Sequence, residues 1–490
     1  MSAHGWGALA DDAVAREIVE VALDAVDGRA EYADVRLVEA EEMRAYRAQG
    51  ADIDERLEHN LGIGVRVLVD GVWGFAARPL GETADAATAA RRAHALAVAS
   101  VGTSAPIRMP PVEARSGRYE TVVGQDPFAV DEDVRQSLLA EALAAASLPP
   151  EVVSAQVGVN AKRQHRHFGC SVGSRQHQHF VETGLLVVVI AAGHGDAQRR
   201  SYPNSFHGDT AAAGWEFVVG RDLVTNAARV GEEAVALLTA PMAPSGVADV
   251  VIGAQQLSLQ IHESAGHALE LDRMIGDEAN FAGTSFIGVE DIGSLRYGSP
   301  AVNITSDPTV AGTRGSFAYD DEGTPARRSP LVEGGVVRAA LSNLDSVART
   351  GAVLTGAARS DGWAYLPACF ATHVYLEPGG GSLDELCDRL GEGYYIDDNR
   401  SWSIDERRLN FQFGTEVAYE VRGGKRGRLL KNFSYGGVTP AFWNSVEAVA
   451  GPDESRIFGY PCGKGEPKQW SFLSHGAAPA LVRDLRIGVA

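Results

Sequence analysis

The sequence predicts an α+β protein in which an N-terminal α+β domain is followed by a β-rich C-terminal domain. Two observations lead to this prediction. Over the first 145 residues, segments with apolar residues at helical spacing alternate with strand-like segments. From about residue 300, short apolar runs are separated by turns such as DDEGTPA, VEGGVV and EPGGG, a pattern that is typical of β-rich domains.

The N-terminal domain is expected to span residues 1–145. An Asp-rich start followed by apolar residues at helical spacing predicts a helix over 11–27. Strands are expected over 33–39 and 62–78, where Asp70-Gly71 between two alternating runs is a two-residue hairpin signal. Alanine-rich helices are predicted over 84–100 and 131–146.

Residues 146–240 are expected to form a strand pair and a long connecting helix. The strands are predicted over 154–169 and 174–193, because the second contains the buried-type run LLVVVIAA. The helix is predicted over 213–238 and is followed by the linker TAPMAPSG.

The third domain is predicted to span residues 241–490. It begins with a strand over 248–253 and a helix over 254–272, of which one face, with Leu257 and Ile261, is expected to pack on a core. Two short helices are expected near 383–390 and 441–448.

The charge balance argues against two classes of partner. The 490 residues include 44 basic and 64 acidic ones, which gives a formal charge of -20. Such a surface repels phosphate backbones and anionic headgroups, so we expect neither nucleic acid nor membrane as a partner. The N-terminus has no secretory signal pattern, and the longest apolar run, 185–192, is far shorter than the roughly 20 residues of a membrane span. We therefore expect a cytoplasmic protein.

A motif of the form H-E-x-x-x-H occupies residues 262–267 of the predicted helix. Its histidines, His262 and His267, are five residues apart, and on an ideal α-helix such residues point about 140° apart. Both can bind one ion only if the helix opens into a π-type turn or ends there. Gly266 is the residue that most cheaply permits such a distortion. The spacing therefore predicts a backbone irregularity.

This motif has two interpretations. As a metal site, it would use His262 and His267 as imidazole ligands of Zn²⁺, with Glu263 as the general base that takes a proton from water activated by the metal. As a structural feature, it would consist of two helix histidines that are satisfied by neighbouring polar groups. The motif alone leaves both possibilities open.

Four stretches in order resemble the TldD/PmbA family of metallopeptidases: HESAGHALELDRMIGDEANFAGTSF at 262–286, YDDEGTPA at 319–326, VYLEPG at 374–379 and CGKGEP at 462–467. They cover most of the chain from residue 250 onward. The resemblance implies a TldD/PmbA-like fold around a substrate tunnel, one zinc ion per chain and a peptide substrate in unfolded form. It also implies a homodimer, or a heterodimer with a PmbA-like subunit that lacks the ligands.

The resemblance implies that the third zinc ligand is the cysteine of the C-G-K motif, here Cys462. From the residues themselves, Cys462 is also the most plausible thiol, because it lies in a Gly/Pro-rich stretch that we expect to be a turn, with Lys464 near enough to favour the thiolate. Glu270, three residues after His267, is the alternative ligand, although we expect it to orient a ligand histidine instead.

The other cysteines carry no functional pattern. No C-x-x-C pair is present, so we expect free thiols. Cys387 falls on an amphipathic helix pattern, which indicates a buried structural thiol, and the pattern around Cys170 and Cys369 indicates no function.

Four further histidines lie at alternate positions of the two predicted paired strands: His165, His167, His177 and His179. All four can face one side of a sheet, so a second metal site is conceivable. Arginines interleave with them and no acidic or thiol partner is near in the sequence. We therefore expect a solvated face.

One segment departs from the family pattern. Before VYLEPG the family usually has an arginine-methionine pair, whereas this chain has Ala371, Thr372 and His373. If this segment lines the substrate channel, peptide specificity is altered. The sequence thus predicts a zinc-dependent amide hydrolase acting on a peptide or peptide-like substrate. The alternatives are an amidase dedicated to a small conjugate of a natural-product pathway, and a non-catalytic subunit of a heterodimer.

Overall fold

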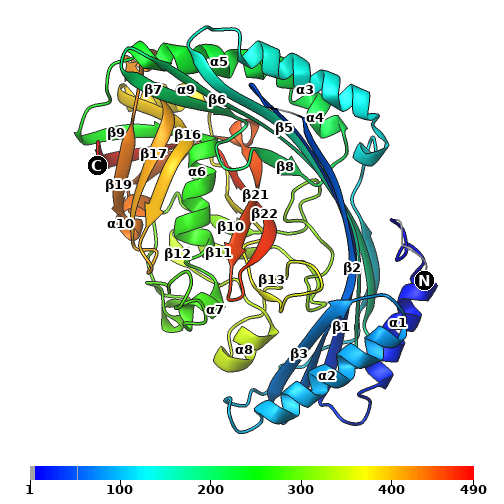
Figure 1. Ribbon diagram of the computed structural model, residues 1–490. Coiled ribbons are helices and arrows are strands. Elements are labelled where there is room, and N and C mark those ends of the chain that lie inside the picture. Colours follow the sequence, from blue (N-terminus) through cyan, green and yellow to red (C-terminus); the bar gives the residue numbers. More distant parts are fainter. Residues whose placement is uncertain (1–5, 52, 490) are drawn as a thin grey trace.

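The computed structural model describes residues 6–51 and 53–489. Within them, the N-terminal half forms a long curved sheet of eight strands with the order β3-β2-β1-β5-β6-β4, in which β7 and β8 also pair with β6 (Figure 1). Strands on both sides of the expected domain boundary at residue 145 belong to this sheet, since β1 pairs with β5. Its strands are β1 (Tyr32–Ala48), β2 (Asp54–Val69), β3 (Val72–Pro79), β4 (Ser116–Glu120), β5 (Val152–Cys170), β6 (Arg175–Gly193), β7 (Asp196–Tyr202) and β8 (Asp209–Ala211).

Helices cover the convex face of this sheet at its two ends (Figure 1). One pair consists of α1 (Asp12–Asp24) and α2 (Ala84–Ser100), and the other end carries α3 (Glu132–Ala146), α4 (Glu216–Gly220) and α5 (Leu223–Thr239). A short 3-10 helix, Pro127–Ala129, precedes α3. The helices predicted over 11–27, 84–100 and 131–146 are thereby confirmed. Small alanines of α2 face the sheet, and burying them lets helix and sheet approach closely.

Two predictions of local backbone have opposite outcomes. The hairpin between β2 and β3 is confirmed, because Asp70 and Gly71 have φ of 48° and 73°, as a two-residue turn of this type requires. The single helix predicted over 213–238 is wrong, because the chain breaks between α4 and α5. Asp222 adopts a left-handed φ of 42° there, and its carboxylate accepts a hydrogen bond from the Thr225 amide of α5.

The C-terminal half contains two larger sheets in the described part of the chain. One has six strands in the order β12-β11-β10-β15-β22-β21, and the other has seven, in the order β16-β9-β23-β19-β17-β18 with β20 paired to β23. The strands are β9 (Gly246–Ile252), β10 (Ile304–Ser306), β11 (Ser329–Glu333), β12 (Val336–Val337), β15 (His373–Leu376), β16 (Glu392–Ile404), β17 (Asn410–Arg422), β18 (Lys425–Leu430), β19 (Ser434–Val438), β20 (Val446–Val449), β21 (Arg456–Lys464), β22 (Gln469–Ala477) and β23 (Ala480–Ile487).

Short elements connect these sheets. The pair β13 (Ala358–Arg359) and β14 (Ala368–Cys369) forms a separate ribbon. The helices are α7 (Leu271–Met274), α8 (Leu344–Thr350), α9 (Leu383–Leu390) and α10 (Thr439–Asn444), with 3-10 turns at Val289–Asp291 and Pro452–Glu454. The β-rich character is confirmed, as is the helix near 383–390. The helix predicted near 441–448 ends at Asn444, where β20 soon begins.

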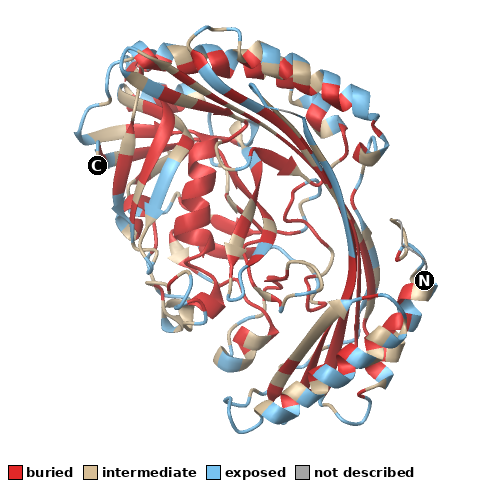
Figure 2. Cartoon of the chain, in the orientation of Figure 1, coloured by how far each residue is buried: buried red, intermediate tan, exposed pale blue. Residues whose placement is uncertain are grey.

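Helix α6 (Ala254–Ile261) lies in the interior of the C-terminal half, between the two sheets, and every residue of it is buried (Figures 1 and 2). We expected only one face to pack on a core. The buried glutamines are accommodated because they find partners: Gln256 donates to the Tyr435 hydroxyl at 2.9 Å, and Gln255 accepts from the Asn399 amide at 2.6 Å. A helix anchored on all sides can hold the residues that follow it rigidly.

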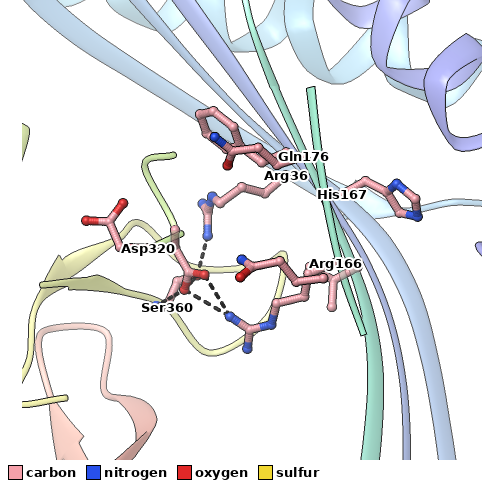
Figure 3. Close-up of a pocket in the computed structure, with 10 residues that line it drawn as sticks. Arg36, Arg166, His167, Gln176, Asp320 and Ser360 are labelled. Carbon is pink, nitrogen blue, oxygen red and sulfur yellow. Dashed lines mark hydrogen bonds and ion pairs between the residues drawn. The ribbon is translucent and has the colours of Figure 1, made fainter. Parts of the chain in front are cut away.

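The YDDEG stretch joins the concave face of the large sheet to the C-terminal half. Asp321 pairs with Arg166 at 2.8 Å, and Glu322 pairs with Arg66 at 2.6 Å. Beside a small cavity of about 20 Å³, Arg36 donates to Ser360 and Arg166 donates to Asp321. Figure 3 shows Arg36 and Arg166 pointing toward Ser360. This stretch therefore holds the two halves together. No helix among the described residues is long and apolar enough to cross a membrane.

Candidate metal centre

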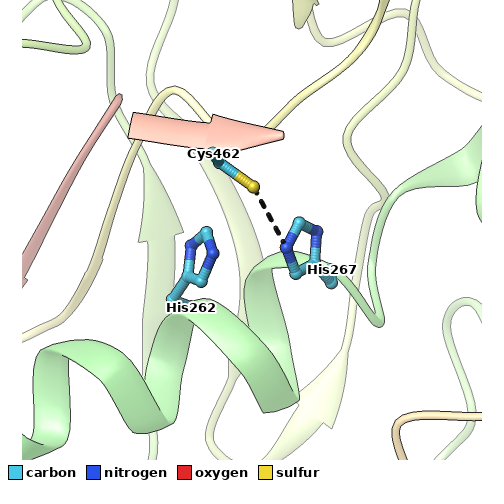
Figure 4. Close-up of side chains that lie close together, drawn as sticks. All are labelled: His262, His267 and Cys462. Atoms are coloured by element: carbon cyan, nitrogen blue, oxygen red, sulfur yellow. Dashed lines mark hydrogen bonds between the residues drawn. The ribbon is translucent and has the colours of Figure 1, made fainter. Parts of the chain in front are cut away.

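Helix α6 continues directly into a π-helical turn over His262–Gly266. The amide of His267 donates to the carbonyl of His262 at 3.0 Å, which is the five-residue hydrogen bond of a π turn. The two imidazole rings face each other with centroids 4.5 Å apart and planes at 64° (Figure 4). The predicted irregularity is confirmed, and its effect is to bring both rings to the same side of the helix.

Gly266 has a smaller role in this turn than expected. Its φ is not in the left-handed region. A Cβ added at this position would come no nearer than 3.6 Å to Ala371, His475 or the carbonyl of Ile261. The turn therefore does not require glycine at this position.

Cys462 reaches the two histidines from β21, about 200 positions later. The donor atoms of His262, His267 and Cys462 all lie within 4.8 Å of one another, and the sulfur lies 3.4 Å from His267 Nε2 (Figure 4). Cys462 does not lie in a turn, as we expected, but in a strand that pairs with β22. Pro461 is tolerated because β21 lies at the edge of its sheet.

His475 on β22 orients the ring of His262, and no sequence pattern indicated this role. Its Nδ1 lies 3.0 Å from the carbonyl of Val374, so this nitrogen carries the proton and donates. Its Nε2 then accepts from His262 Nδ1 at 2.8 Å. The consequence is that His262 Nε2 is left with its lone pair free.

Glu270 orients the ring of His267 in the same way. Its Oε2 lies 3.1 Å from His267 Nδ1 and also accepts from Arg273 at 3.2 Å and from Lys464 at 3.1 Å. His267 Nε2, which faces the sulfur, is therefore the unprotonated nitrogen. Carboxylates that accept from the far nitrogen of a ligand histidine are usual around metal sites.

Lys464 favours the Cys462 thiolate only weakly, because burial raises the pKa of this thiol and the charge of Lys464 is the smallest of the opposing influences. Its ammonium group is fully buried and bonds to Glu270, to Asp272 at 2.8 Å and to the carbonyl of Cys369. Its positive charge thus neutralises the carboxylates of Glu270 and Asp272. The nearest described partner of the Cys462 sulfur is instead His267.

The electrostatics of the donor set suit a borderline-soft cation. Burial holds the pKa of His262 and of His267 well below the usual value, so both rings are neutral with lone pairs available. Burial also raises the pKa of the Cys462 thiol, followed in effect by Glu270 and Glu263. Two neutral imidazoles and one thiol that ionises on binding form a donor set that fits zinc.

Glu263 lies beside this group and is only 7 % exposed. Its Oε2 accepts from Arg408 Nη1 at 2.9 Å. Burial raises the pKa of Glu263, and Arg408 opposes that rise. Arg408 reaches the site from the β16–β17 loop, where it adopts a left-handed φ of 62° and also donates to the carbonyl of Ala282 at 2.9 Å. No sequence pattern pointed to Arg408.

The segment that departs from the family pattern lies beneath the site. Ala371, Thr372 and His373 are at most 2 % exposed. Thr372 pairs with Ser306 at 3.0 Å, and His373 Nδ1 lies 2.9 Å from the Ser474 hydroxyl. These residues belong to the buried packing next to Ser474 and Gly266.

The remaining cysteines are buried free thiols: Cys170, Cys369 and Cys387. Cys387 lies on α9, as predicted. The expectation of a solvated histidine face is wrong, because His165, His167 and His177 are each at most 8 % exposed.

Comparison with protein families gives two matches. Residues 245–488 match the model of the PmbA/TldA metallopeptidase C-terminal domain, and residues 33–97 match that of the PmbA/TldA metallopeptidase domain 1. The first match includes all three donor residues and Glu263.

Several curated relatives are named metalloproteases. A metalloprotease of Methanothermobacter thermautotrophicus is 29 % identical over 90 % of this chain and 92 % of its own length. A metalloprotease of Methanocaldococcus jannaschii is 25 % identical over 89 % of this chain and 92 % of its own. A zinc metalloprotease TldD homolog of Saccharolobus solfataricus is 25 % identical over 50 % of this chain and 52 % of its own.

Solved structures share the fold. A Thermotoga maritima protein superposes with a TM-score of 0.77 at 18 % identity, covering 96 % of this chain and all of its own. TldE of Thermococcus kodakarensis has a TM-score of 0.72 at 14 % identity, with 97 % and 100 % coverage. At these identities the likeness concerns the fold alone.

Proposed function

The chain belongs to the PmbA/TldD family of metallopeptidases, and on that basis we propose that it is a zinc-dependent hydrolase of amide bonds in peptides. His262, His267 and Cys462 hold the zinc ion, one per chain, and Glu263 is the general base. The observation that carries the proposal is the convergence of two neutral imidazoles and a thiol, from positions almost 200 apart, beside a buried carboxylate.

When bound, the zinc ion supplies Lewis-acid activation of water and of the substrate carbonyl. The residues of the chain do the remaining work. Glu263 takes the proton from the attacking water and returns it to the leaving amine. Arg408 holds the Glu263 carboxylate in place. His475 and Glu270 keep the free nitrogens of the two ligand rings aimed at the same point.

The substrate in this proposal is an unfolded peptide or a peptide-like amide. The names of the relatives support proteolysis, and a tunnel of the kind implied by the family would admit extended chains only. The partner is a second copy of the chain or a PmbA-like subunit, a class for which the TldE structure is the related example. The presence of all three donors, His262, His267 and Cys462, argues against a non-catalytic subunit, because such a subunit does not need a metal site.

Glu263→Gln tests the role of the base. This variant keeps both ligand histidines and the thiol, so we expect it to retain zinc and to lose cleavage of unfolded casein, followed by mass spectrometry of new termini. Glu406→Gln, an exposed glutamate on the nearby loop, is the matched control and should keep both properties. An active Glu263→Gln variant would remove Glu263 from the reaction. Wild-type protein that holds zinc but cleaves no peptide would overturn the peptidase assignment.

A further inference from the structure

The four histidines of the large sheet form a stack on its convex face, in which His165, His167 and His177 are buried and His179 is partly exposed. His165 lies opposite His179, and His167 lies opposite His177, on β5 and β6. The rings of His167 and His177 are stacked with centroids 4.0 Å apart. His167 points to the opposite side of the sheet from Arg166, as Figure 3 shows. The stack shares no residue with the candidate metal centre.

Helix α1 brings a carboxylate to this stack. Asp12 is the first residue of α1, and a donor atom of Asp12 lies within 4.8 Å of donor atoms of both His167 and His177. An acidic partner, which is lacking near these histidines in the sequence, is thus supplied from about 155 positions away. Asp12 Oδ1 and His177 Nδ1 lie 2.6 Å apart. Both atoms are buried, and at this distance the imidazole N–H donates to the carboxylate.

The hydrogen bonds of the Nε2 atoms of His167 and His177 indicate which ring nitrogens can present a lone pair to an ion. His167 Nε2 lies 2.8 Å from the carbonyl of Leu9, so it carries a proton and leaves Nδ1 with a lone pair. His177 Nε2 lies 3.0 Å from His165 Nδ1. Binding of an ion would require the His177 proton to move from Nδ1 to Nε2, which can donate to His165 Nδ1, so that His177 Nδ1 presents its lone pair to the ion.

A cavity of about 210 Å³ opens beside these atoms, with Asp12, His167 and His177 in its wall, so an ion and a water ligand can enter. Arg118 also lines it but is bonded to the other oxygen of Asp12 at 2.6 Å. Arg175 is paired with Glu20 at 2.8 Å. Arg16, the third arginine in the wall, is exposed to solvent. Because Arg118 and Arg175 are engaged by carboxylates, Oδ1 of Asp12 keeps its capacity to bind a cation.

We propose that Asp12, His167 and His177 form a second metal site, which takes a divalent ion of the zinc, cobalt or nickel class. Two imidazoles and one carboxylate with room for water are a donor set that these ions accept. The ion would tie the start of α1 to the centre of the large sheet. The site uses none of the residues proposed for catalysis, so it does not depend on the proposed function.

The test uses the full chain with the candidate catalytic donors removed, His262→Ala/Cys462→Ala, dialysed against zinc. We expect about one zinc per chain to remain by elemental analysis. Adding Asp12→Asn or His177→Ala should remove it. Adding His179→Ala, which changes the same stack outside the three-residue group, should leave it in place. Zinc that is absent from the first variant, or that stays after Asp12→Asn and His177→Ala, would overturn the proposal.

A second readout covers variants that fold poorly. Zinc should raise the thermal unfolding temperature of the His262→Ala/Cys462→Ala chain, because an ion that binds only the folded state stabilises it, and this increase should vanish with Asp12→Asn. Cobalt should give the weak visible bands of a site with nitrogen and oxygen ligands, without a thiolate charge-transfer band. Equal zinc-dependent stabilisation with and without Asp12 would contradict the assignment.

Discussion

His475 Nε2 lies 2.8 Å from His262 Nδ1, and this contact fixes which nitrogen of His262 is free. His475→Ala should therefore lower zinc affinity about 10- to 100-fold, the usual effect of removing a group that orients a ligand. Competition with a chelator measures it. His373→Ala is the control, because His373 is equally buried on the adjacent strand but bonds only to Ser474. An equal loss of zinc affinity in both variants would mean that His475 contributes packing and does not orient His262.

Arg408→Ala should shift the pH dependence of hydrolysis. Burial raises the pKa of Glu263, and Arg408 is the largest opposing influence. Without Arg408 the pKa of Glu263 rises further. Because the base must be ionised to accept a proton, the acidic limb of the kcat/KM profile should move to higher pH. Arg407→Ala, at an exposed neighbouring position, should leave the profile in place. An unchanged acidic limb in Arg408→Ala would show that this arginine does not act on the base.

Zinc binding should release about one proton per ion near neutral pH. Burial raises the pKa of the Cys462 thiol, so the thiol is protonated in the metal-free protein, while the two histidines are already neutral. Acidification then weakens binding, and the logarithm of the affinity should rise with pH with a slope of about one. The measurement is best made in an Asp12→Asn chain, to separate the two sites. In Cys462→Ser the slope should disappear; a wild-type slope near zero would mean that the thiol is not a ligand.

Gly266→Ala should be tolerated. The nearest atoms to its added Cβ are at 3.6 Å, an ordinary contact distance, and alanine is the better residue for helical backbone by up to about 1 kcal/mol. Zinc content and the free energy of unfolding should therefore stay close to the wild-type values. Gly459→Ala is the contrasting variant, since its Cβ would overlap the carbonyl of Thr210. Loss of zinc in Gly266→Ala would mean that the π turn does need glycine.

Local signals predicted much of the fold. Residues close together in the sequence determine the apolar spacing of α1 and α2 and the Asp70-Gly71 turn. Each of these features is found in the structure. Pairings over long distances had no such signal. β1 and β5 are separated by more than 100 residues, and α6 is buried on every side only because two sheets enclose it.

The same division holds for the site. The spacing of His262 and His267 predicted the π turn from helix geometry alone, whereas Cys462 was singled out as third ligand by the family resemblance. His475, Arg408 and Asp12 were missed, because each meets its partner more than 140 positions away. Contacts of this kind depend on how strands and loops pack against one another. The spacing of residues in a single sequence does not predict them.

The central claim is that one ion is held jointly by His262, His267 and Cys462. The most direct measurement is an anomalous difference map at the zinc edge, from crystals of the zinc-loaded chain. The account predicts a peak that lies within about 2.4 Å of the Cys462 sulfur and of one nitrogen from each histidine. A peak that is coordinated by Glu270 while the sulfur lies apart, or no peak between the two rings, would contradict it.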